Sequence, residues 1–565
     1  MHEIGEQRSV LRHAPVAAVV VMYAWVAWQR RWMTDDGYIN IRVVEQWLAG
    51  NGAVFNIGER VEVATSTLWL WMIALPAAVL PVEPSVIAVV LGWMCSVGAA
   101  ALMAAGSIRF SRRAGLAAVD AVPLPFGLLL LLGITQFSDF ATSGLENGLT
   151  WLWLAGCFFG LTAHIGSDRS MCQPWWLPVV IGLGWLVRPD AALYSAAFLC
   201  ALALMARRTW RSALVTVGLA GVLPVGYEIF RMGYYATMVP NTALAKNASD
   251  SLWSFGLNYL VGLMRHYALL IPMTVLAVAV VIVVRRLITS RSWAAFWLFS
   301  ATIGAAMVHV VYVTRVGGDF MFGRFLLAPI FAMSLPVAVI EVRPAALRRW
   351  AGAGLAVLLV WTFYSGATVQ AQRFYGHGVQ DERFIYTGWV PSGTTLRPWD
   401  WAGFSFYEHG FSFAQERDRG QRYFQEADGS RHPVADGYDL VITHNVMGIV
   451  SVTAGNDVMI IDNLGLADPV ASRTDMEPGV RFERVGHMGH PAEYRWARYA
   501  APTPEDTPAV RAARHAMKCG DLARLHRGIS DPLTPQLFWS NVRDAPRLTR
   551  LRIPFDPIAA ERQFC

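Results

Sequence analysis

Charged residues are scarce in this chain. Asp, Glu, Lys and Arg make up 16% of its 565 residues, whereas 55% of the residues are hydrophobic. An average soluble domain is about 25% charged, so this deficit excludes a wholly soluble protein and indicates a membrane protein with a soluble part. Internal repeats and low-complexity segments are also lacking. Because transporters often contain internal repeats, their absence argues against a transporter.

Cysteine is equally scarce, at six residues, and none of them belongs to a CxxC motif or a zinc-spaced His/Cys cluster. Cys519 and Cys565 lie in the polar C-terminal part, where a disulfide is one alternative if that part is extracytoplasmic. A cleavable signal pattern is missing too, so residues 11–28 are expected to remain as a membrane anchor. The other four cysteines lie in or beside apolar segments, where buried thiols are expected: Cys95, Cys157, Cys172 and Cys200.

What the chain has instead is a series of long apolar segments. A helix that crosses the hydrocarbon core needs about 20 apolar residues. By this measure we predict about 10–12 membrane segments, at 11–29, 66–82, 85–108, 121–137, 146–164, 174–188, 190–206, 212–230, 257–284, 293–313, 325–341 and 347–366. Two of them are short and meet at Arg188-Pro189-Asp190, which indicates two broken half-helices beside a buried cavity.

Hydropathy collapses after about residue 367, which predicts a membrane domain (1–367) and a soluble domain (368–565). The strand-like runs 439–443 and 458–461 and a helix-like stretch at 509–525 indicate that the soluble domain is mixed α/β. The net charge of +6 comes from short basic clusters between apolar segments. We interpret these clusters as positive-inside loops, not as a nucleic-acid-binding surface. This orientation predicts a multi-pass plasma-membrane protein with an extracytoplasmic (periplasmic) C-terminal domain; the number of crossings between residues 30 and 113 stays open.

Two adjacent carboxylates, Asp35 and Asp36, follow the first apolar segment. One Asp at mid-bilayer costs roughly 2.5–3.5 kcal/mol, so we place the pair in a wet external loop (30–65), where carboxylates serve as a general base or bind a divalent cation. Which of the two acts is open, and so is whether a metal binds them. Alternatively, one caps the helix that follows. That helix-like run is amphipathic, with Ile41, Val44 and Trp47–Leu48 on one side, and suits a helix on the bilayer surface.

Short motifs along nearly the whole chain resemble those of the GT-C glycosyltransferases, polytopic enzymes that use polyprenyl-phosphate sugars. More narrowly, they resemble the actinobacterial (mycobacterial) arabinofuranosyltransferase B family. The motifs specify the superfamily better than the linkage. They are TDDGYINIR (34–42), VFNIGERVE (54–62), TSTLW (65–69), TSGLE (142–146), RPD (188–190), PNTALAK (240–246), GGDFM (317–321), GRFL (323–326) and IDNLGLADP (461–469).

The resemblance implies a GT-C fold and a polyprenyl-phosphate-dependent arabinofuranosyltransferase. Its donor would be decaprenyl-phosphoryl arabinose, and its acceptor the arabinan of arabinogalactan and lipoarabinomannan in the cell wall. The product would be a terminal β-(1→2) linkage. Donor and product are then both β-linked, which implies net retention, whereas a single displacement assisted by a base inverts. The Asp pair therefore acts as base, as nucleophile or only through its charge.

Three alternatives to this function remain. The first is another polyprenyl-phosphate-sugar glycosyltransferase, either a mannosyltransferase or an arabinosyltransferase of different linkage. The second is a lipid-linked sugar flippase or transporter, and the third is a non-enzymatic assembly factor. The oligomeric state is not specified by the sequence.

The chemistry of such a donor suggests roles for other polar residues. The leaving phosphate needs cationic stabilisation more than a general acid, and the expected donor-phosphate ligands are Arg188, Lys246, Arg315 and Arg324. For Arg188 and Asp190 the alternative is a structural ion pair, for Glu146 it is a helix cap, and for His309 a core histidine is expected. Aromatic residues between Trp399 and Phe413 either stack on sugars or form the core. The expected substrate-binding residues are Glu146, Asp190, Asn241, Asp319, His444 and His487.

Overall fold

The computed structural model describes residues 2–118, 120–166, 174–206, 210–246, 251–343, 345, 350–369, 375, 378–477 and 489–565. The chain forms two compact units, each built from three segments. Unit 1 comprises Met1–Trp32, Ala88–Pro224 and Ser251–Glu382, and unit 2 comprises Met33–Ile87, Val225–Asp250 and Arg383–Cys565. Most of the expected soluble domain therefore lies in unit 2 with two segments from earlier in the chain, and a boundary at residue 367 stays a prediction.

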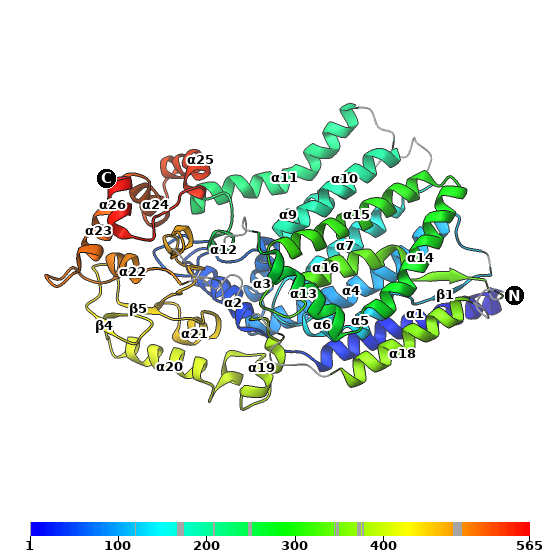
Figure 1. Cartoon of the computed structure of the whole chain (residues 1–565), viewed down its shortest axis with the longest axis horizontal. Coiled ribbons are helices and arrows are strands. Elements are labelled where there is room, and N and C mark those ends of the chain that lie inside the picture. Colours follow the sequence, from blue (N-terminus) through cyan, green and yellow to red (C-terminus); the bar gives the residue numbers. More distant parts are fainter. Residues whose placement is uncertain are drawn as a thin grey trace. The chain divides into compact units, whose positions relative to one another are not determined.

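Unit 1 is mostly helical (Figure 1). Among the described residues, four helices are long and apolar enough to cross a membrane: α4 (Pro84–Arg113), α11 (Trp210–Tyr235), α14 (Leu270–Thr289) and α15 (Trp293–Arg315). Helices α4, α11 and α19 (Glu382–Trp389) contribute residues to both units. The remaining elements of unit 1 are α1 (His2–Gln29), β1 (Val122–Leu124), η1 (Gly127–Leu129), α5 (Leu130–Gly133), α6 (Thr135–Asp139), α7 (Asn147–Thr162), α8 (Trp176–Gly182), α9 (Gly184–Val187), η2 (Pro189–Ala191), α10 (Ala192–Ala206), α13 (Trp253–His266), α16 (Arg324–Ser334), η3 (Leu335–Val337), β2 (Ile340–Val342) and α18 (Gly352–Thr368).

Three of the predicted membrane helices are interrupted. Segment 121–137 begins as strand β1, which pairs antiparallel with β2 at the end of segment 325–341. Pro123 and Pro125 explain the first break, because proline disfavours a helix interior. Segment 257–284 is two helices, α13 and α14, separated at Ala268, which adopts a positive φ of 47°. The indole of Trp361 donates a hydrogen bond to the Tyr267 carbonyl at this break (2.7 Å).

The break predicted at Arg188-Pro189-Asp190 is confirmed. Helix α9 ends at Val187, Arg188 is extended, and the chain resumes as η2 and α10. The cause is Pro189, which pushes the residue before it out of helical geometry. Of the cysteines expected to be buried, Cys95 and Cys157 are buried, and Cys172 lies outside the described residues. The prediction is wrong for Cys200, which is exposed on α10; because this helix is apolar on every side, its sequence does not show which face is buried.

Unit 2 is the predicted mixture of helices and strands. Its four-stranded sheet has the order β4-β3-β5-β6 and comprises β3 (Tyr423–Gln425), β4 (Arg431–His432), β5 (Leu440–Thr443) and β6 (Met459–Ile461). Strands β3, β5 and β6 run parallel. The predicted helix at 509–525 is two helices, α23 (Pro508–Ala516) and α24 (Gly520–Ser530). The remaining elements are α2 (Asp35–Leu48), α3 (Thr67–Ala77), α12 (Asn241–Ala245), η5 (Pro398–Trp401), α20 (Ser405–Asp418), α21 (Gly448–Ala454), η6 (Ala471–Arg473), α22 (Ala492–Tyr499), α25 (Pro535–Thr549) and α26 (Pro557–Phe564).

Helix α2 is buried within unit 2, so the expectation of a helix on the bilayer surface is wrong. Ile39 and Val43 belong to the same hydrophobic core as Leu440 and Ile442 of strand β5. Arg42 is fully buried, and its guanidinium donates to backbone carbonyls, among them those of Ser451 and Val458. Satisfying these donors makes burial of the charge tolerable. Arg42, on the polar side of α2 that was expected to face water, is therefore hydrogen-bonded within unit 2.

Candidate functional site

The acidic pair lies in the first turn of α2. The residue before the helix is Thr34, whose backbone is extended, and the helix itself begins at Asp35. The expectation that one of the two aspartates is the N-cap of α2 is therefore wrong. Negative charge in the first turn is still favourable, because the N-terminal end of a helix carries partial positive charge.

Asp35 instead binds the start of a different helix. Its carboxylate accepts hydrogen bonds from the backbone N–H groups of Gly448 (3.2 Å) and Ile449 (2.8 Å), the first two residues of α21. The approach is so close that a Cβ at position 448 would lie 1.9 Å from the Asp35 carbonyl oxygen, and only glycine fits there. Burial raises the pKa of Asp35 to about 7; the two N–H groups oppose this shift, and the charge of Asp36 adds to it. Asp35 is thus a buried, engaged carboxylate.

Asp36 has a different environment, although it is the next residue. It is half-buried, whereas the Asp35 side chain is almost inaccessible, with 6% of the residue exposed. A carboxylate that reacts with a substrate has to be reached by it. The two aspartates are therefore not equivalent: Asp35 fixes α2 against α21, and Asp36 follows it at a more accessible position. A cation that bridged the two aspartates would have to bind Asp35 oxygens that already accept hydrogen bonds from two N–H groups.

The other expected site residues of unit 2 divide in the same way. Asn241 is buried, and its amide donates to the carbonyls of Gly465 and Leu466, so it holds the 461–469 motif. Lys246, at the end of α12, is half-buried. His444 is half-buried directly after β5, where its ring lies 3.2 Å from the ring of His409. His487 lies outside the described residues.

Unit 1 contains a buried network of arginines and carboxylates. Arg188 donates to Glu146 and, through Nε, to Asp190 (2.9 Å). His309 approaches the other Asp190 oxygen (3.2 Å), so it is the buried, hydrogen-bonded histidine that was expected. Glu146 stands at the N-cap position of α7, as the helix-cap alternative expects, but its side chain makes no cap hydrogen bond and pairs with Arg188 instead. Because a buried carboxylate needs a charged partner, Arg188 is required to compensate the charges of Glu146 and Asp190.

Arg324 belongs to the same network, but its contacts there are longer. Its guanidinium lies 3.4 Å from Glu146 and 3.7 Å from Asp319. Both arginines flank the ring of Phe325, at 5.1 Å and 5.5 Å from its centroid. The fourth expected cation, Arg315, is exposed at the end of α15, where Nε donates to Ser251 (3.1 Å). Of the three expected arginines, the structure thus brings Arg188 and Arg324 together.

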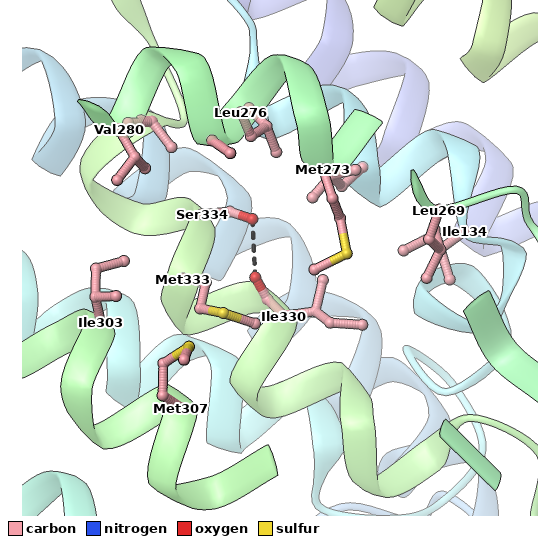
Figure 2. Close-up of a pocket in the computed structure, with 13 residues that line it drawn as sticks. Ile134, Leu269, Met273, Leu276, Val280, Ile303, Met307, Ile330, Met333 and Ser334 are labelled. Carbon is pink, nitrogen blue, oxygen red and sulfur yellow. Dashed lines mark hydrogen bonds between the residues drawn. The ribbon is translucent and has the colours of Figure 1, made fainter. Parts of the chain in front are cut away.

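An apolar cavity of about 240 Å³ lies along α16 in the same unit (Figure 2). Its one hydroxyl-bearing lining residue is Ser334, which donates its proton to the Ile330 carbonyl (2.8 Å), so the wall offers no unsatisfied hydroxyl. Met307 is 58% exposed, so the lining reaches the outer surface of the unit. Ile330 is six residues beyond Arg324 on α16, a rise of about 9 Å. The lining comes from Leu130, Ile134, Leu269, Met273, Leu276, Ala277, Val280, Ile303, Met307, Ile330, Met333, Ser334 and Val337.

Metal-binding potential is limited within the described part of the chain. There, the side chains of His515, Cys519 and Cys565 are the one set that brings three ligand atoms together. The two sulfurs are joined as a disulfide, which realises one of the alternatives left open by the sequence and removes both thiolates.

Sequence reasoning missed two features of unit 2. Gly448 gave no signal of its own, because its close contact is to a residue 413 positions away. The second is Asn463. Asn445 was already expected, with His444, among the polar residues that could line an acceptor groove, but Asn463 carried the same signal, since each asparagine stands two residues after a predicted strand, where polar side chains of parallel strands meet. Their side chains are hydrogen-bonded to each other (2.6 Å).

Comparisons with known proteins agree on one family. Residues 413–559 match the model of the AftB family C-terminal domain. The chain is 32% identical to the terminal beta-(1->2)-arabinofuranosyltransferase of Mycobacterium tuberculosis, over 95% of both chains. It is also 32% identical to the protein of the same name from Corynebacterium glutamicum, over 92% of this chain and 83% of that one. No solved structure matches the chain.

Proposed function

The chain belongs to the AftB family and is an arabinofuranosyltransferase of the membrane, and on this premise we propose that decaprenyl-phosphoryl arabinose is its donor. The proposed acceptor is the arabinan of arabinogalactan or lipoarabinomannan. The support is the activity for which both relatives are named, together with the four membrane-length helices, which suit an enzyme whose donor is a lipid.

The proposed topology is that of a multi-pass GT-C enzyme of the plasma membrane, with about 10–12 membrane segments and an extracytoplasmic C-terminal domain. The Cys519–Cys565 disulfide supports an oxidising environment for this part of unit 2. Disulfides persist in extracytoplasmic compartments and are rare in the cytosol.

We assign donor binding to unit 1. Arg324 binds the donor phosphate, because a charge-assisted contact to a phosphate is stronger than its long contacts to Glu146 and Asp319. Arg188 positions Glu146 and Asp190. The apolar cavity along α16 accommodates the first part of the isoprenoid chain, since it begins about 9 Å from Arg324 along the helix and has an apolar lining.

We assign the catalytic carboxylate to Asp36 of unit 2. Over the whole reaction, the bond between the anomeric carbon and the phosphate oxygen breaks, and the phosphate leaves with the electron pair. A bond forms between that carbon and the acceptor oxygen, whose hydroxyl proton passes to a carboxylate. A base and a nucleophile both have to reach the substrate. The contrast between half-buried Asp36 and Asp35, which is held by α21, carries this assignment.

The test compares Asp36→Asn with wild type in purified protein. Loss of one well-placed catalytic carboxylate costs on the order of 10²–10⁴ in rate, so transfer to a synthetic arabinofuranoside should fall by that factor. Donor binding and the unfolding midpoint should change little, because Asp36 is half-buried and asparagine keeps the size and shape of its side chain. Transfer at the wild-type rate would refute the assignment.

A further inference from the structure

The carboxyl edge of the parallel strands in unit 2 carries polar side chains that have no role in the chemistry assigned above. Strands β5 and β6 run parallel, so the residues that follow them lie at the same edge. These residues are His444 and Asn445 after β5, and Asn463 after β6. In open α/β sheets, ligands bind outside the carboxyl ends of the strands. This edge therefore has the position of a ligand site.

The two asparagines present hydrogen-bonding groups that unit 2 does not use up. Asn463 donates one amide hydrogen bond to Asn445 (2.6 Å). The side-chain oxygen of Asn463 is buried and, within the described part of the chain, accepts no hydrogen bond. Asn445 itself is exposed. A buried acceptor without a donor is unfavourable, so a ligand hydroxyl that donates to it would relieve this cost.

Aromatic side chains adjoin His444, the residue before Asn445. His409 of α20 contacts His444, and Phe406 of α20 lies edge-on to the same ring, with centroids 6.4 Å apart. Phe404 continues the row at 4.8 Å from Phe406. Burial lowers the pKa of His444, so its imidazole is neutral at neutral pH. Amides, a neutral imidazole and aromatic rings suit a neutral polyol better than a phosphate, which requires cations.

The start of α2 lies at this same edge. Helix α21 begins at Gly448, three residues after Asn445, and its first N–H groups bind Asp35. In Figure 1, α21 is labelled between β5 and α2. Asp36, the next residue after Asp35, is therefore positioned by the same contact that links α2 to the loop after β5.

We propose that this edge is a furanose-binding subsite, in which Asn445 and Asn463 hydrogen-bond hydroxyl groups of the acceptor's terminal arabinose and Phe406 contacts the apolar side of its ring. The subsite rests on the proposed function, because it holds the acceptor of the reaction assigned to Asp36. The subsite concerns the binding of the acceptor, whereas the assignment of Asp36 concerns the transfer step.

The experiment replaces Asn445 or Asn463 by alanine in the full-length enzyme. Each change should raise the acceptor KM about tenfold, the effect of one lost hydrogen bond at a desolvated site. The donor KM and kcat should stay within about twofold. Asn51→Ala is the matched control: Asn51 is also an exposed asparagine of unit 2 with one amide partner, Gln46 at 2.7 Å, and its replacement should leave the acceptor KM unchanged.

Direct binding separates this proposal from the one for Asp36. A synthetic arabinofuranose disaccharide is titrated into Asp36→Asn protein and into the same protein carrying Asn445→Ala, with unfolding midpoints measured for both. Weaker binding by the second protein, at an equal midpoint, supports the subsite even if Asp36→Asn still transfers sugar. The subsite is overturned if both proteins bind the disaccharide equally and if the acceptor KM of Asn445→Ala matches that of the Asn51→Ala control. This conclusion holds whatever the activity of Asp36→Asn.

Discussion

Replacing Gly448 by alanine should disable the enzyme without removing any ionisable group. The new Cβ would lie 1.9 Å from the Asp35 carbonyl oxygen, whereas ordinary contact begins at about 3.4 Å. The backbone of α2 and that of α21 would have to separate by more than 1 Å. Both hydrogen bonds from α21 to the Asp35 carboxylate would then lengthen beyond bonding distance, since they are already 2.8 and 3.2 Å long.

The expected magnitude follows from this displacement. A misplacement of about 1 Å in a catalytic group costs on the order of 10²-fold in rate, and Asp36 is carried by the turn that must move. Overpacking costs typically 1–3 kcal/mol in stability, so the unfolding midpoint should fall as well. The two effects distinguish Gly448→Ala from Asp36→Asn, which is expected to lower the rate alone.

The assay follows transfer of arabinose from a polyprenyl-phosphoryl donor to a synthetic arabinofuranoside by mass spectrometry of the product. The matched control is Gly388→Ala in α19, because a Cβ at position 388 meets no atom within 4 Å. That variant should transfer as well as wild type does. If Gly448→Ala also keeps its rate within about twofold at an equal amount of folded protein, the contact between Asp35 and α21 does not position the catalytic turn.

Two predictions concern unit 1. Arg324→Gln should raise the donor KM about ten- to a hundredfold and leave the acceptor KM unchanged, because a charge-assisted contact contributes roughly 1.5–3 kcal/mol. Arg324→Lys should recover only part of this loss, because lysine keeps the charge but lacks the fork geometry; an unchanged donor KM in Arg324→Gln would place the phosphate elsewhere. Met333→Trp should fill the cavity along α16 and weaken use of long-chain donors more than use of short-chain donor analogues. The control Met94→Trp, at an exposed position of α4, should leave the use of both donors unchanged.

Local features of the sequence predicted much of the fold. Segment 146–164 became α7 and segment 293–313 became α15, because both are continuous apolar runs with no internal proline. The strands β5 and β6 were also predicted, since short β-branched runs bounded by turn residues favour strands. The predictions failed where a local signal opposed the average hydropathy, as at Pro123, or where a tertiary contact such as that of Trp361 ended a helix.

The candidate site was predictable only in part, for a physical reason. The adjacent aspartates and the Arg188-Pro189-Asp190 break are local signals, and both were recognised. The difference between Asp35 and Asp36 depends on Gly448, which follows them by more than 400 residues. Likewise, the pairing of Arg188 with Glu146 joins side chains 42 positions apart. Such contacts are set by packing of whole elements, and one sequence carries no direct record of them.

The environment of Asp35 also predicts how stability depends on pH. Its pKa is raised from 3.8 to about 7 by burial, so between these two values the folded protein holds a proton that the unfolded chain has released. Stability therefore falls as pH rises through this window, by up to about 4 kcal/mol at roughly 1.36 kcal/mol per pKa unit. Asp35→Asn has no such proton, and its unfolding free energy should decline less than that of wild type between pH 4 and 7.

Denaturant unfolding of purified protein, followed by tryptophan fluorescence at pH 4.5 and pH 7.5, measures this difference in slope. Asp436→Asn, which removes an exposed carboxylate of unit 2, controls for the loss of one charge and should keep the wild-type pH dependence. A wild-type slope in Asp35→Asn would mean that the Asp35 carboxylate is as well stabilised in the folded protein as in water. The two N–H groups of α21 would then fully offset its burial, and Asp35 would be an anion at neutral pH.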